Sequence, residues 1–319
     1  MPDRAASIDA FLQGTGWAAA KRMPLAGDLS SRHYTRLLQG NASAILMDAE
    51  TTMVPFLNMT LWLADHGFAV PGIIDEQASD GLILLEDLGD LSVTKHLENA
   101  GKSDEIDPLC VDLLLALRAA TPVPDLPAPD ASTLVEWTRL ADQHYPGIST
   151  IDLAPFREVL HACLADGLQT PRTLSLRDFH ADNLMWLPDR TGLTRLGLLD
   201  YQDAFLTHPC YDLVSYLTDA RTQIAPSRRA EVLTHYLNRS GDQPDAFRTA
   251  FAAFSAQRNL RILGIFTKSA AMGKAHHLSK LPRVHGYFLE ALQHNVFREV
   301  REQTIAALPD PTAVQKACV

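Results

Sequence analysis

Several absences narrow the class of this 319-residue chain. No uninterrupted apolar run approaches the roughly 18 to 20 residues of a membrane span, and the N-terminus lacks the apolar segment of a secretory signal. Cysteine is scarce and forms no Cys-x-x-Cys pair, which argues against a structural zinc site and suits a reducing compartment. We therefore expect a cytoplasmic protein with no membrane partner. The cysteines are Cys110, Cys163, Cys210 and Cys318.

The balance of charge is acidic overall but uneven along the chain. A net charge of −10 argues against broad nucleic-acid binding and would suit a polycationic ligand. Residues 246–289, however, contain no Asp or Glu. The same stretch holds seven basic side chains, Arg248, Arg258, Arg261, Lys268, Lys274, Lys280 and Arg283.

The N-terminal part of the chain favours a small sheet. We expect strands at residues 17–25, 32–38, 42–48, 70–75 and 81–86, which together make a sheet of about five. A turn is predicted at residues 27–31. Residues 53–66 have helical apolar spacing, and Gly67 is a suitable helix stop.

After Asp90 the pattern becomes mostly helical. Residues 121–129 carry four prolines and read as an extended connection. The length suits two domains, and we expect an α+β fold with a β-rich N-lobe at 1–88 and a larger helical C-lobe at 89–319. Helices are predicted at residues 106–120, 155–166, 211–222, 227–240, 245–272 and 284–307, with breaks allowed in the longer ones.

One stretch carries the strongest chemical signal. Asp178 stands five residues before Asn183, and Asp200 follows seventeen residues later at the end of an apolar run. This pattern is typical of phosphoryl transfer in protein-kinase-like enzymes. Asp178 is the predicted base or orienting carboxylate, and Asn183 and Asp200 offer the oxygen ligands that Mg²⁺ prefers. The plain alternative makes them turn formers and a strand-end cap.

The motif resembles that of the aminoglycoside phosphotransferase and choline kinase-like superfamily. The family pattern His-Gly-Asp-x-His-x-x-Asn reads Leu-Arg-Asp-Phe-His-Ala-Asp-Asn over residues 176–183. The resemblance implies a bilobal protein-kinase-like fold with ATP as phosphate donor. It also implies that Glu86, Asp87 and Leu88 form a nucleotide-binding hinge, and that Asp212 anchors the catalytic loop as a structural residue.

Within the superfamily the chain looks most similar to bacterial anomeric sugar kinases. The supporting segments are residues 27–36, 45–49, 177–185, 199–204 and 263–266. This resemblance implies ATP-dependent phosphorylation of the C1 hydroxyl of N-acetylmuramate or N-acetylglucosamine in cell-wall recycling. We expect a monomer acting on a small amino sugar.

The sequence departs from most kinases of this fold at the phosphate-binding lysine. Met47 stands near the expected position on the third strand, and the helix over 53–66 has no Glu to pair with a lysine. We predict that Ser30, Ser31 and Arg32 take part in nucleotide binding, with Arg32 helping to neutralise phosphate. Arg36 is expected to be a solvent-exposed strand arginine.

The basic stretch discriminates between substrates. A polycationic aminoglycoside would want a pocket lined by carboxylates, whereas N-acetylmuramate carries a lactyl carboxylate that arginine binds well. Arg258, Arg261 and Lys268 are therefore predicted to bind substrate, and a solvated basic helix face is the alternative. His180 and Asp182 are further candidates on the substrate side, and for His180 a purely structural role is the alternative.

Trp137 and Tyr145 either stack on a sugar or pack in the core.

Two other functions stay open from the sequence. One is a kinase for a different small-molecule hydroxyl, such as an aminoglycoside or an amino alcohol. The other is a nucleotide-binding pseudokinase, against which the intact set of Asp178, Asn183 and Asp200 argues.

Overall fold

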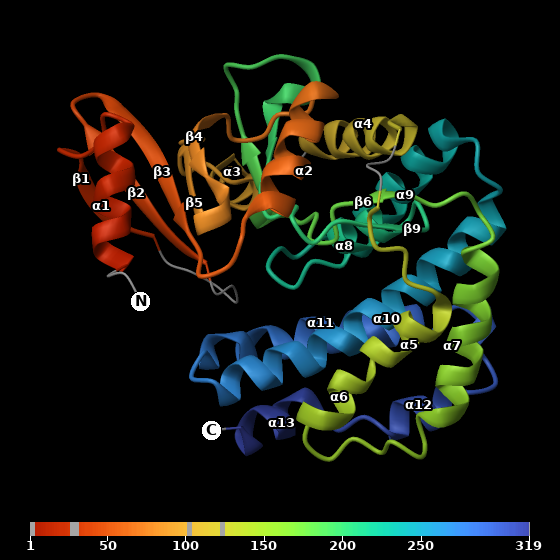
Figure 1. Ribbon diagram of the computed structural model, residues 1–319. Helices are drawn as coiled ribbons and strands as arrows, with labels where there is room; N and C mark the ends of the chain where they lie inside the picture. Colours follow the sequence, from red (N-terminus) through yellow and green to blue (C-terminus); the bar gives the residue numbers. More distant parts are fainter. Residues whose placement is uncertain (1–3, 26–31, 101–103, 122–124, 319) are drawn as a thin grey trace. The chain divides into compact units, whose positions relative to one another are not determined.

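The structure, a computed structural model, describes residues 4–25, 32–100, 104–121 and 125–318 (Figure 1). Its contacts divide the chain into two compact units. The first comprises Met1–Ser92 with Leu184–Gln202, and the second comprises Val93–Asn183 with Asp203–Val319. Each unit thus combines two stretches of chain, and the predicted functional division into 1–88 and 89–319 stays a prediction.

The first unit is built on an antiparallel sheet of five strands in the order β1-β2-β3-β5-β4. The predicted sheet of about five strands is therefore confirmed. Strand β1 begins later than expected because Ala20 donates a backbone hydrogen bond to Trp17 (3.1 Å) and closes a turn there. The predicted turn at 27–31 lies outside the described residues. The strands are β1 (Lys21–Pro24), β2 (His33–Gln39), β3 (Ala42–Asp48), β4 (Ile73–Gln77) and β5 (Leu82–Glu86).

Helix α1 (Arg4–Gly14), which the sequence pattern did not predict, shares a core with one face of this sheet (Figure 1). Phe11 and Leu12 are buried there against alternate residues of β2, β3 and β5. Arg4 fixes the start of the helix, because its guanidinium donates to Asp48 Oδ1 (2.8 Å) and to the Asp80 carbonyl (2.8 Å). Alternation along the strands creates the apolar face that α1 covers.

The same unit contains helix α2 (Val54–Asp65), close to its predicted bounds, and a short hairpin of β7 (Leu184–Trp186) and β8 (Leu196–Leu198). Leu198 donates a backbone hydrogen bond to Ala69 (2.8 Å), which ties the hairpin to the chain after α2. The hairpin ends immediately before Asp200, so its register determines where that carboxylate stands.

The second unit is mainly helical, as predicted. Its longest helix, α10 (Pro244–Ala271), has 28 residues, is buried on most of its surface and contacts α6, α7, α8 and α11 (Figure 1). Two short strands, β6 (Thr173–Ser175) and β9 (Phe205–Thr207), pair beside the loop that carries Asp178. The remaining α-helices are α3 (Val93–Ala100), α4 (Ile106–Ala119), α5 (Ala131–Trp137), α6 (Arg139–His144), α7 (Ala154–Gly167), α8 (Tyr211–Leu217), α9 (Pro226–Ser240), α11 (Leu281–Ala291), α12 (Arg301–Ala306) and α13 (Pro311–Ala317).

The predicted helix over 284–307 is interrupted, as the allowance for breaks anticipated. Helix α11 ends at Ala291 and α12 begins at Arg301. Arg301 stabilises the break, because its side chain donates hydrogen bonds to the carbonyls of Leu292 (2.7 Å) and Gln293 (2.9 Å) just after α11. These are carbonyls that a helix end leaves without partners.

Among the described helices, none has both the length and the apolar character needed to cross a bilayer.

Candidate active site

A buried carboxylate, Asp212, fixes the start of the loop that carries Asp178. Asp212, near the start of α8, accepts hydrogen bonds from Ser175 Oγ (2.7 Å) and from the backbone nitrogens of Leu176 (2.7 Å) and Arg177 (3.0 Å). Burial raises the pKa of Asp212 to about 6, although these hydrogen bonds act to lower it. The carboxylate is therefore ionised at neutral pH and keeps all three donors.

Asp178 itself is oriented by an arginine from α10. The Arg258 guanidinium, only 6% exposed as a residue, donates to the Arg177 carbonyl (3.0 Å) and lies 3.3 Å from Asp178 Oδ1. Burial pushes the pKa of Asp178 upward, but Arg258 and the neighbouring Arg177 and Arg261 outweigh burial, so the pKa is lowered. Asp178 is an ionised acceptor with a fixed direction.

Arg177 and Arg261 both lie over the ring of Trp137, the last residue of α5. Their guanidinium carbons are 5.4 Å and 4.9 Å from the ring centroid. Arg177 also adopts a positive φ of 73°, which a non-glycine residue rarely does. Asp212 and Arg258 hold the backbone in that conformation through its nitrogen and its carbonyl.

His180 and Asn183 complete the loop. The Asn183 amide donates to the Asp178 carbonyl (3.0 Å) and lies 3.3 Å from His180 Nε2. Burial lowers the pKa of His180 well below its ordinary value, so the ring is neutral. Asp182 points to a different partner, since its carboxylate lies 3.2 Å from Arg221 Nε.

The other predicted metal ligand, Asp200, belongs to the first unit. It follows β8 with a positive φ of 58° and accepts a hydrogen bond from Gln202 (2.7 Å). Arg32, one of the predicted phosphate-binding residues, lies 3.8 Å from Asp200 Oδ1. Burial raises the pKa of the adjacent Tyr34, while Arg32 acts to lower it. The acidic Asp200 and the basic Arg32 therefore lie next to each other in this unit.

The predicted hinge begins at the last residue of β5. Glu86 accepts from Gly72 N (3.1 Å) and from Arg190 (2.7 Å), and Leu88 is half-buried. Asp87 accepts from Arg36 (3.0 Å) and from Gly89 N (3.0 Å). Ser30 and Ser31, the other predicted nucleotide contacts, lie outside the described residues.

The expectation of an exposed Arg36 was wrong. Its side chain is 15% exposed and forms ion pairs with Asp87 and Asp90. Asp87 of the hinge and Asp90 just beyond it supply the carboxylates that pair with this half-buried strand arginine.

Met47 lies in β3, near the position where most kinases of this fold carry the phosphate-binding lysine. It is fully buried and paired in register with Tyr34 of β2 and Ile83 of β5. Helix α2 supplies no Glu. The sheet thus closes this position with an apolar side chain and leaves no charge to be compensated.

The remaining predicted substrate residues have different surroundings. Lys268 is exposed on α10. Tyr145 is 1% exposed and donates to the Pro309 carbonyl (3.0 Å), so it packs in the core. Arg177 was not predicted as a site residue, although its position directly before Asp178 in the motif was a usable signal.

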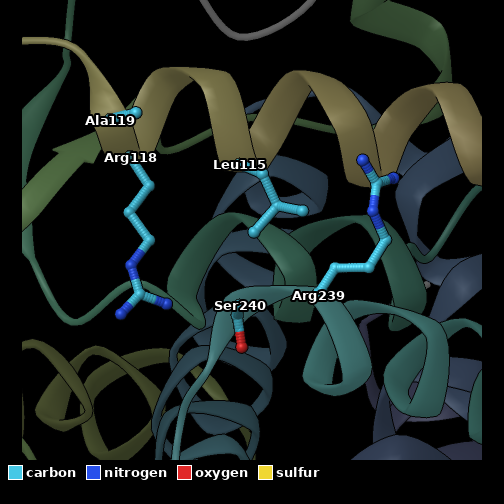
Figure 2. A pocket seen from close by; sticks show the side chains of 5 residues that line it. All are labelled: Leu115, Arg118, Ala119, Arg239 and Ser240. Atoms are coloured by element: carbon cyan, nitrogen blue, oxygen red, sulfur yellow. The ribbon is translucent and has the colours of Figure 1, made fainter.

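A separate pocket of about 470 Å³ lies between α4 and α9 (Figure 2). Both of its arginines are paired, Arg118 with Asp242 (2.8 Å) and Arg239 with Asp112. The pocket includes none of the residues predicted for catalysis, nucleotide or substrate. Its lining residues are Leu115, Arg118, Ala119, Arg239 and Ser240.

Three known proteins are similar to this chain in sequence or in fold. The N-acetylmuramate/N-acetylglucosamine kinase of Caulobacter vibrioides is 32% identical, over 89% of this chain and 91% of that protein. A choline/ethanolamine kinase family protein from Mesorhizobium loti shares the fold with a TM-score of 0.65 at 12% identity, covering 95% of this chain and 99% of that one. The ADP-bound aminoglycoside phosphotransferase APH(2'')-Ib has a TM-score of 0.59 at 13% identity, covering 93% and 99%.

These likenesses confirm the predicted resemblance and the predicted α+β fold. The model of the phosphotransferase enzyme family matches residues 21–249, which is most of the chain. On the strength of that match and of the relative at 32% identity, the chain belongs to the phosphotransferase enzyme family.

Proposed function

We propose that this enzyme transfers the γ-phosphate of ATP to the anomeric hydroxyl of N-acetylmuramate or N-acetylglucosamine. The observation that carries the proposal is the Asp178 carboxylate, kept ionised and aimed by the buried Arg258. Support for the sugar comes from the Caulobacter relative, whose name describes a kinase for both compounds.

In this proposal Asp178 accepts a hydrogen bond from the attacking hydroxyl and takes its proton as the new O–P bond forms. The bond from the γ-phosphorus to the bridging oxygen breaks at the same time, and ADP leaves with that oxygen. A carboxylate of lowered pKa is a weak base. A weak base is sufficient for phosphoryl transfer, because the transition state of this reaction is loose and depends mainly on how the attacking hydroxyl is positioned. An anomeric hydroxyl is also more acidic than an ordinary alcohol. Asp212 and Arg258 fix the loop so that the carboxylate does not swing away.

The nucleotide and metal roles belong to the same proposal. We assign Mg²⁺ ligation to Asn183 and Asp200, whose amide and carboxylate oxygens are hard donors. Arg32 would balance phosphate charge, and the hinge residues would receive the base. When bound, Mg²⁺ supplies neutralisation of the phosphate oxygens. The ADP-bound relative by fold is compatible with a nucleotide donor.

We also propose a monomeric, cytoplasmic enzyme that acts on a free small molecule. The acidic charge balance and the scattered cysteines support this part.

The test is an assay of the purified chain with Mg-ATP and each amino sugar in turn. We expect ATP consumption, and a phosphorus NMR signal that couples to the anomeric proton. Turnover with kanamycin-like compounds alone would show a different acceptor. Mg-ATP binding without turnover of any sugar would show a pseudokinase.

A further inference from the structure

Beside Asp178 the second unit holds more positive charge than its carboxylates balance. Arg258 is committed to Asp178 and to the Arg177 carbonyl. Within the described ranges, the guanidiniums of Arg177 and Arg261 form no ion pair with a carboxylate and donate no hydrogen bond; their contact is the ring of Trp137. Two cations therefore lie near the candidate catalytic carboxylate, and neither has a carboxylate in direct ion-pair or hydrogen-bond contact.

This arrangement is costly for the folded protein. Burial lowers the pKa of Arg261, and repulsion from Arg177 and Arg258 adds to this, while Tyr211 and Asp178 raise the pKa without restoring its ordinary value. A half-buried cation without a partner gains little from its Trp137 contact compared with what full hydration or an ion pair would provide. Stability alone does not account for two such side chains on one ring. An anionic ligand would supply the missing charge.

The geometry favours a planar anion carried by the acceptor. Arginine binds carboxylates through two parallel N–H donors, and Trp137 is held edge-on by Phe205 (5.9 Å between centroids, 83°), so the platform is fixed. Arg177 and Arg261 lie close enough to Asp178 to lower the pKa of its carboxyl, so this positive charge stands near the group that would orient the sugar hydroxyl. N-acetylmuramate carries a carboxylate on its lactyl ether, and N-acetylglucosamine does not.

We propose that Arg177, Arg261 and Trp137 form a carboxylate subsite that makes the enzyme prefer carboxylate-bearing amino sugars over neutral ones. This rests on the proposed function and adds the residues that set specificity. Lys268, also predicted for this role, is exposed further along the same helix and is left out of the subsite.

The experiment compares both sugars in wild type, Arg261→Met and Arg261→Lys. For Arg261→Met we expect kcat/KM with N-acetylmuramate to fall roughly 10- to 100-fold, chiefly through KM, because a charged hydrogen-bonded pair is lost. With N-acetylglucosamine it should change less than about threefold. Arg261→Lys keeps the charge but not the paired donors, so its loss should be intermediate.

Arg248→Met is the matched control. It removes the same charge from the same helix at an exposed position, where Arg248 lies 3.7 Å from Asp245, and should leave the ratio between sugars unchanged. Thermal unfolding of Arg261→Met should be unchanged or raised, since an uncompensated cation is removed. That result would exclude misfolding as the cause of a changed preference.

Two outcomes would overturn the subsite. An equal fall with both sugars would assign the arginines to the loop or to the transferred phosphate. An unchanged ratio would make them packing residues. Failure of the proposed function looks different, because wild type itself would then turn over neither sugar.

Discussion

At the scale of single residues, the candidate site is defined by which groups its charged side chains contact. Arg258 illustrates this, since its guanidinium holds both the carbonyl of Arg177 and the carboxylate of Asp178. Arg258 was predicted as a substrate ligand because residues 246–289 are visibly basic in the sequence. The sequence does not show that the Arg258 side chain is buried. Asp178, Asn183 and Asp200 could be selected by spacing, since that spacing reflects a short loop and a hairpin.

Replacing Asp178 by Asn tests the role of the carboxylate. We expect kcat to fall by about 10² to 10⁴, because the hydroxyl loses its proton acceptor, while ATP affinity is kept. Kinetics and nucleotide binding on one preparation measure this. Because Arg258 would lose its counterion, thermal unfolding must be followed in parallel. A folded variant with near-normal turnover would remove Asp178 from the role of base.

At the scale of secondary structure elements, close approach of α10 to α6 builds the platform around Trp137. Gly264 of α10 permits it, since a Cβ there would lie 2.5 Å from the backbone nitrogen of Ala141. Such a distance requires the helices to separate. Gly264 stands one turn beyond Arg261, so the same contact determines how Arg261 meets Trp137.

Gly264→Ala should therefore destabilise the protein by roughly 1 to 3 kcal/mol, as overpacking does. Gly286→Ala in α11 is the matched control, because a Cβ at Gly286 meets nothing within 4 Å. There alanine should be neutral or stabilising by up to about 1 kcal/mol, through the lower backbone entropy of the unfolded chain. Urea unfolding of both variants and of wild type measures these changes in the free energy of unfolding. Equal behaviour would mean that α10 and α6 adjust without cost.

Elements with regular patterning could be predicted from the sequence, and the others could not. Strands β2, β3 and β5 and helix α10 were found within a residue or two. Helix α1 was missed because its buried side chains, Phe11 and Leu12, are adjacent and give no helical period. Short helices such as α5 and α6 carry too few turns to show one. The Trp137 platform therefore could not be assembled from sequence, since it depends on helix contacts.

At the scale of the whole molecule, stability should depend on pH through buried groups. His208 stacks on Phe254 (5.7 Å between centroids), and its Nδ1 accepts a hydrogen bond from Cys210 N (3.1 Å). Burial lowers the pKa of His208 to about 4. Between this value and the ordinary pKa of about 6.5, the unfolded chain binds a proton that the folded one excludes. The stability from His208 is thus lost as pH falls through that interval. Asp212 acts oppositely, because its raised pKa makes the folded state hold a proton up to about pH 6.

His208→Asn isolates the first effect, since the asparagine oxygen can still accept from Cys210. Between pH 7 and about pH 4.5, the variant should lose less unfolding free energy than wild type, by about 2.5 kcal/mol. Urea unfolding at a series of pH values measures the difference. Parallel pH curves would show that His208 is protonated in the folded state as readily as in the unfolded one.

The buried Met47 has a consequence for regulation. Where a strand lysine pairs with a helix glutamate, displacing the helix breaks the pair and switches a kinase off. Met47 lies between Tyr34 and Ile83 in the sheet, and α2 carries no Glu, so helix movement would break no charge pair here. The enzyme has no electrostatic latch at this position. We expect its rate to follow the concentrations of its substrates rather than a signal transmitted through α2.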